Sequence, residues 1–114
     1  MPETRHRKLV RDRVPALIRS RGEDTRTTVL APSEFTPALL DKLVEESVEL
    51  RMAPATERLE ELADVWEVLT TVVQDLGFTL DEVEQAATFK RIVRGGFSER
   101  VWLESTSDAA AVRN

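Results

Sequence analysis

Apolar residues recur at helical spacing along two long stretches of the chain. The stretch from residue 56 to 76 places its large apolar residues on one side of a helical wheel drawn at about 100° per residue. These residues are Leu62, Val65, Trp66, Leu69, Val72, Val73 and Leu76. The stretch from residue 36 to 51 has a similar stripe, formed by Leu39, Leu40, Leu43, Val44, Val48 and Leu50. Both stripes are typical of amphipathic helices that pack one face against a core.

Start and stop signals give the two long helices their limits. Thr36-Pro37 is a good helix start, a capping residue followed by proline, with Ser33 as an alternative cap one turn earlier. This helix is expected to run to about Arg51 and to end before Pro54. Thr56 can then cap the second helix, which we expect to continue to Leu76.

A third main helix follows Thr79, which stands three residues before Glu82 in the pattern of a capping box. Gly95-Gly96 is expected to close it. Pro15 favours a short helix near the N-terminus, ending near Gly22. Strand signals are weak and limited to Val29-Leu30 and the segment 97–104.

The sequence therefore predicts an all-α fold, an antiparallel bundle of three main helices and a short N-terminal helix, with minimal β-structure. We expect one domain over residues 8–104, with flexible ends at 1–7 and 105–114. Three amphipathic helices make a thin core for this length. We therefore expect a homodimer, or a higher homo-oligomer, to complete the bundle.

Composition excludes several classes of protein. Cysteine is absent, which excludes disulfides and thiolate metal sites and fits a cytoplasmic location. The net charge of −5 argues against binding to a nucleic-acid polymer. No apolar run approaches the length of a membrane span.

Two pairs of acids are the candidates for chemistry. Glu46 with Glu49, and Glu61 with Asp64, are each spaced i, i+3 on consecutive helices. Glu61 falls within the edge of its apolar stripe, and Glu46 borders the stripe of the preceding helix. A carboxylate on a half-buried face is costly unless it is paired or bound to metal. If the two helices pack antiparallel, these four acids can bind a divalent ion. If the helices do not pack in this way, the acids are ordinary solvated side chains.

Carboxylates alone, without His or Cys nearby, form a hard oxygen site suited to Mg²⁺, with Mn²⁺ as a substitute. Basic residues lie towards the two ends of the chain and could meet a small polyanion. They are Lys8, Arg11, Arg13, Lys90, Arg91, Arg94 and Arg100. Any of them can equally pair with surface acids.

The pattern Glu45-Glu46-x-x-Glu49 followed by Glu61-x-x-Asp64 resembles the all-α nucleoside triphosphate pyrophosphohydrolases, the MazG-like superfamily. The opening that runs from Lys8 to Pro15 is similar to that of a MazG-related group of small proteins. The close of that group is similar to Arg94-Gly95-Gly96-Phe97 with Arg100-Val101-Trp102-Leu103. The superfamily also holds the phosphoribosyl-ATP pyrophosphohydrolases and the dimeric dUTPases. Together these segments cover most of residues 8–104.

The resemblance implies a Mg²⁺-dependent enzyme that cleaves a nucleoside triphosphate between its α- and β-phosphates, as in house-cleaning of unwanted nucleotides. It implies that Glu46, Glu49, Glu61 and Asp64 bind the metal. Glu45 occupies the first acid of the motif and could contact a second metal or orient the attacking water. Two alternatives stay open at this stage. One is phosphoribosyl-ATP hydrolysis in histidine biosynthesis, and the other is a non-catalytic helical module that binds a protein or senses nucleotides.

Overall fold

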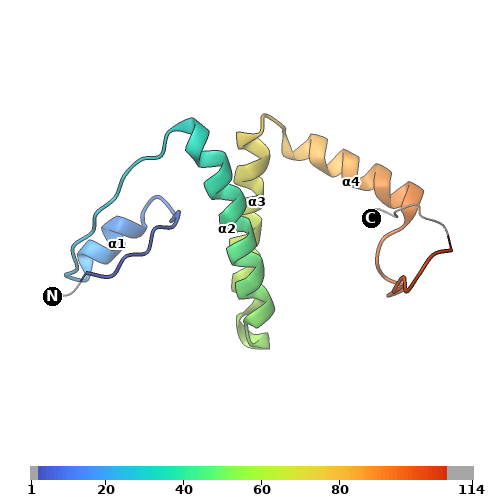
Figure 1. Ribbon diagram of the computed structural model, residues 1–114, viewed down its shortest axis with the longest axis horizontal. Helices are drawn as coiled ribbons and strands as arrows, with labels where there is room; N and C mark the ends of the chain where they lie inside the picture. Colours follow the sequence, from blue (N-terminus) through green and yellow to red (C-terminus); the bar gives the residue numbers. More distant parts are fainter. Residues whose placement is uncertain (1–2, 108–114) are drawn as a thin grey trace. The chain divides into compact units, whose positions relative to one another are not determined.

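A computed structural model describes residues 3–107, in which the regular elements are all helices and no strand is found. The elements are α1 (Val14–Ser20), α2 (Pro32–Met52), the 3₁₀ turn η1 (Ala55–Glu57), α3 (Arg58–Asp75) and α4 (Leu80–Arg94), as Figure 1 shows. The all-α prediction is confirmed. The ends expected to be flexible fall partly outside the description, which omits residues 1–2 and 108–114.

The weak strand signals at Val29-Leu30 and in the segment 97–104 did not lead to strands. Val29 is 99% exposed and Trp102 is 86% exposed, and neither segment pairs with another within residues 3–107. A β-branched or aromatic run forms a strand only when a partner supplies the ladder hydrogen bonds.

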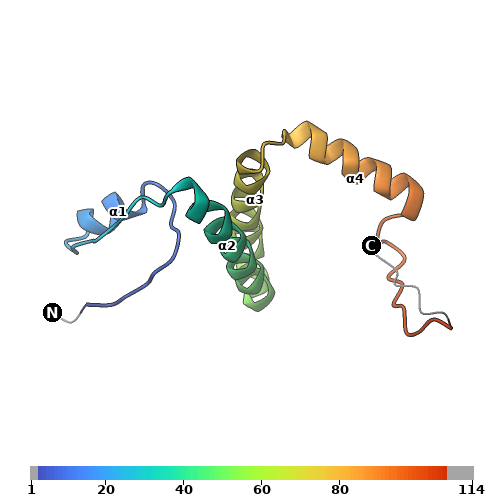
Figure 2. The ribbon, with the colours of Figure 1, turned by 45° about the horizontal axis from the view of Figure 1, so that its top comes forward.

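Helices α2 and α3 form an antiparallel hairpin and lie side by side in Figures 1 and 2. Their contact buries Leu39 of α2 and Val72 and Val73 of α3. The hydroxyl of Thr36 donates a hydrogen bond to Asp75, which ties the first turns of α2 to the end of α3. These are the only large apolar side chains buried among the described residues, so the core is as thin as the sequence indicated.

The long helices begin at other residues than the capping signals suggested. Helix α2 begins at Pro32, and its third residue Glu34 accepts a hydrogen bond from the Ala31 N–H at 3.0 Å. The helix therefore starts at Pro32, where Glu34 caps the first turn, and the predicted start at Thr36-Pro37 lies inside α2. Thr56 lies within η1 instead of capping α3, because the chain leaves Pro54 through a tight 3₁₀ turn.

The signals around the shorter helices were correct. Pro15 lies in the first turn of α1, and Gly22 follows the helix with φ +89°. Thr79 Oγ1 accepts the Glu82 N–H at 3.1 Å, while Glu82 Oε1 accepts the Thr79 N–H at 3.1 Å. This reciprocal pair is the predicted capping box, and Gly95 closes α4 with φ +83°.

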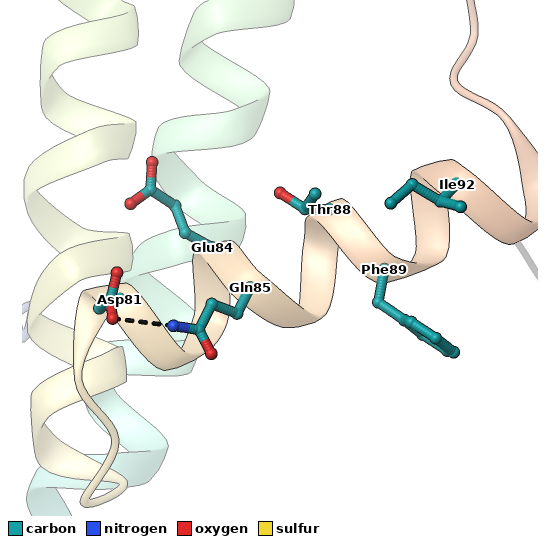
Figure 3. Close-up of a pocket in the computed structure, with 6 residues that line it drawn as sticks. All are labelled: Asp81, Glu84, Gln85, Thr88, Phe89 and Ile92. Atoms are coloured by element: carbon teal, nitrogen blue, oxygen red, sulfur yellow. Dashed lines mark hydrogen bonds between the residues drawn. The ribbon is translucent and has the colours of Figure 1, made fainter.

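The chain divides into two compact units, residues 1–78 and 79–114. In the second unit, Figure 3 shows six side chains of α4 around a shallow surface, with Asp81 accepting a hydrogen bond from Gln85 Nε2 at 3.0 Å. All six come from one helix, and Phe89 and Ile92 are 67% and 78% exposed. This surface is therefore an open helix face and not an enclosed cavity.

Candidate metal centre

The hairpin brings acids of α2 and α3 together around Glu46. Their carboxylate oxygens form two triads, one of Glu45, Glu46 and Glu49 and one of Glu46, Glu61 and Asp64. Within each triad the oxygens lie within 4.8 Å of one another. The four acids proposed as ligands thus meet at Glu46, in two overlapping groups and not at a single point.

Two oxygens at the centre of this cluster are buried without a partner. Glu46 is only 7% exposed, and its Oε2 accepts no hydrogen bond. Glu61 Oε2 is also buried and accepts no hydrogen bond. An unpaired carboxylate oxygen removed from water costs free energy that a cation would recover. The surroundings of Glu46 and Glu61, together with an all-oxygen donor set, fit a hard divalent ion such as Mg²⁺.

Lys42 is the cation that the sequence reasoning missed. Its Nζ lies 3.2 Å from Glu46 Oε1 and 3.3 Å from Glu45 Oε1, and its side chain is 15% exposed. Burial acts to lower the pKa of Lys42, but the hydrogen bonds and charges of Glu46 and Glu45 outweigh it and raise that pKa. The i, i+3 and i, i+4 spacing to these acids was the signal that could have revealed it.

Glu45 and Glu49 lie in different surroundings. The side chain of Glu45 is 34% exposed and forms ion pairs with Lys42 and Lys8. Glu49, which has neither lysine as an ion-pair partner, is exposed.

Like charges raise the pKa of two carboxyl groups in the cluster. For Glu49 the causes are desolvation, then a hydrogen bond with Glu46 and the charges of Glu46, Glu45 and Glu61. For Glu61 they are desolvation and the charges of Asp64, Glu46, Glu57 and Glu60. Lys42 therefore does not neutralise the cluster, and a further cation would stabilise the ionised carboxylates.

Two predicted substrate-binding residues reach the cluster from the segment before α1. Arg11 Nη2 donates to Asp64 Oδ1 at 2.7 Å, and Lys8 Nζ lies 4.0 Å from Glu45 Oε1. Lys8 also lines a small recess beside α2 together with Arg7, Leu9, Ala38 and Asp41. The basic opening and the acid motif, far apart in the sequence, are therefore neighbours in space.

The remaining candidate bases lie elsewhere. Arg13 occupies the N-cap position of α1 and makes no capping hydrogen bond with its side chain. Lys90, Arg91 and Arg94 are exposed on α4, and Arg100 follows in the second unit with φ +55°. The role of these five bases stays a prediction.

Comparisons of the chain with protein-family models, curated proteins and solved structures find no match. The resemblance to MazG-like pyrophosphohydrolases therefore depends on the motif residues quoted above. None of the described helices combines the length and the apolar character needed to cross a membrane.

Proposed function

We propose that this protein is a Mg²⁺-dependent pyrophosphohydrolase that cleaves a nucleoside triphosphate between its α- and β-phosphates. One observation carries the proposal. Two carboxylate triads on neighbouring helices share the buried Glu46, and Glu46 Oε2 and Glu61 Oε2 are buried without a partner. A solvated acidic face would leave such oxygens in water.

Glu46, Glu61 and Asp64 are the proposed ligands of the ion, and Glu49 belongs to the second triad that Glu46 completes. When bound, Mg²⁺ would offset phosphate charge and lower the pKa of a coordinated water. Lys42 fixes one oxygen each of Glu45 and Glu46, so that Glu46 Oε2 stays available to the ion.

Glu49 is the proposed proton acceptor for the attacking water. It is the most exposed acid of the triad that Glu46 completes, and it forms no ion pair within residues 3–107, so its carboxylate can accept a proton. Glu45 is less suited to this task, since Lys42 and Lys8 both hold its Oε1. We assign Glu45 the orientation of the water or a contact to a second ion.

The polyphosphate needs cations beside the acids. Lys8 and Arg11 are the proposed phosphate contacts, because both lie at the edge of the cluster with side chains 45% and 56% exposed. Arg13, Lys90, Arg91, Arg94 and Arg100 remain candidates on their charge alone. The proposed partner is a small-molecule nucleotide in the cytoplasm, and not a nucleic-acid polymer.

A second copy of the chain is the proposed partner that completes the bundle. Along α2, Val44 and Val48 are 65% and 53% exposed, and along α3, Leu62 and Trp66 are 51% and 62% exposed. Exposed apolar stripes of this size mark interaction surfaces. Light scattering on the purified protein should give twice the chain mass or more, and a monomeric mass at micromolar concentration would contradict the assignment.

The experiment that tests the function is pyrophosphate release from a panel of normal and damaged nucleotides, with phosphoribosyl-ATP included. Each substrate is assayed with Mg²⁺, with Mn²⁺ and with excess chelator. We expect metal-dependent release that is lost in Glu61→Gln and kept in the matched control Asp81→Asn on α4. Preference for phosphoribosyl-ATP would indicate the histidine-pathway activity instead. Absence of release from every nucleotide, or release that the chelator does not reduce, would reject the proposal.

A further inference from the structure

Three cations form ion pairs with the acid cluster, Lys8, Lys42 and Arg11, and the last two are held very differently. Lys42 belongs to α2, is 15% exposed and contacts both Glu45 and Glu46. Arg11 belongs to the irregular segment before α1, is 56% exposed and contacts Asp64 alone. The backbone of Arg11 is tied by its carbonyl, which accepts the Val14 N–H at 3.0 Å. Lys42 is therefore a fixed part of the site, whereas the Arg11 side chain can leave it.

Arg11 contacts one of the proposed metal ligands directly. Its Nη2 lies 2.7 Å from Asp64 Oδ1, and Asp64 is the member of the Glu46, Glu61 and Asp64 triad that carries an ion pair with the N-terminal segment. The guanidinium thus supplies a single positive charge at the triad on which the divalent ion would bind. Glu46 Oε2 and Glu61 Oε2 receive nothing from it and remain without a partner.

The strength of this ion pair allows exchange. Pairs between exposed side chains contribute little to stability, because water screens the charges and two long side chains lose freedom. With side-chain exposures of 56% and 39%, Arg11 and Asp64 form such a pair. A divalent ion that contacts all three carboxylates of the triad offers a stronger attraction to Asp64.

We propose that Arg11 and the divalent ion compete for Asp64: the arginine holds this carboxylate in the metal-free protein and is displaced when the ion binds. The proposal depends on the metal site of the proposed function. Displacement also frees the guanidinium, beside the ion, for the phosphate contact proposed above. Arg11 is thus a positioning residue that keeps Asp64 in place until the ion arrives.

The test is the affinity of the purified full-length chain for Mn²⁺ alone, measured by calorimetry at low ionic strength. Wild type is compared with Arg11→Gln and with the matched control Arg13→Gln. Arg13 lies two residues further along, and it makes no ion pair within residues 3–107, so its removal changes the net charge equally. We expect Arg11→Gln to bind Mn²⁺ about two- to fivefold more tightly than Arg13→Gln, the range that corresponds to an exposed ion pair.

Equal affinities of the two variants, or weaker binding by Arg11→Gln, would overturn the competition while leaving the metal site intact. If wild type and both variants all fail to bind Mn²⁺, the metal site itself is rejected and the competition falls with it. Circular dichroism of each variant confirms that the helices are kept.

Discussion

Two pairs of acids with the same helical spacing lie in different surroundings in this molecule. Asp81 and Glu84 on α4 are exposed, and Asp81 is satisfied locally by the Gln85 side chain at 3.0 Å. Glu61 and Asp64 on α3 are also spaced i, i+3, yet Glu61 Oε2 is buried without a partner and Asp64 binds Arg11. The i, i+3 spacing places two acids side by side in both cases.

The difference is the neighbouring helix. The pairing of α2 with α3 adds Glu45, Glu46 and Glu49 to the acids of α3 and leaves Glu46 buried, whereas residues 79–107 form no second helix beside α4. A candidate metal site therefore differs from a solvated face because its carboxylates meet and are buried, more than because of their spacing along one helix. Four predictions test this comparison, from the largest expected effect to the smallest.

Glu46→Gln should have the largest effect, because this residue belongs to both triads. We expect metal-dependent pyrophosphate release and Mn²⁺ affinity to fall by at least about a hundredfold, since changes even in the partners of metal ligands commonly cost ten- to hundredfold. Calorimetry and the nucleotide assay measure both. The control Glu84→Gln on α4 should match wild type, and a Glu46→Gln protein with normal Mn²⁺ affinity would remove the site.

Lys42→Met should destabilise the metal-free protein. The change leaves the carboxylate of Glu46 buried without its cation, which costs about 2–3 kcal/mol of unfolding free energy. Urea denaturation in the presence of chelator measures the loss. Lys90→Met on the exposed face of α4 should change stability by no more than about 0.5 kcal/mol. Equal effects of the two substitutions would show that Lys42 is not a structural cation.

The third prediction concerns the pH dependence of stability. The pKa values of Glu49 and Glu61 are raised above the ordinary 4.5, so the folded protein retains protons that the unfolded chain releases. Their contribution to stability is therefore full below about pH 4.5 and is lost as the pH rises through the folded pKa values. The melting temperature of the metal-free protein should therefore fall over this range.

Glu49→Gln should flatten this part of the melting profile, and Glu84→Gln should leave its slope unchanged. Added Mg²⁺ should oppose the loss at neutral pH, because it binds the ionised carboxylates of the folded state only. A melting temperature that rises steadily as the pH increases above 4.5, measured with chelator present, would contradict the raised pKa values.

The smallest expected effect concerns the start of α4. Thr79→Ala removes the hydroxyl that accepts the Glu82 N–H, and it should weaken the first turn by about 1 kcal/mol. Hydrogen exchange of the amides at the start of α4 should quicken about fivefold. Thr88→Ala, in the middle of α4, is the control and should leave these amides unchanged. Mn²⁺ binding should be normal in both variants.

Much of the fold could be predicted from local chemistry. The apolar stripes gave α2 and α3, and the capping box with the following Gly95 gave both ends of α4. The boundaries that failed, at Thr36 and Thr56, are places where a nearby proline offered a second start. The strand signals failed because a strand needs a partner, which no short run of residues can specify.

The acids themselves were visible in the sequence, as residues that intrude on apolar stripes. What only the tertiary structure decided is which carboxylates meet and which cations reach them. Lys42 contacts Glu45 and Glu46 while Glu49 stays exposed, and Arg11 lies 2.7 Å from an aspartate 53 residues away. Helical periodicity fixes neighbours within one helix, while contacts between helices and with the N-terminal segment depend on packing that the whole chain determines.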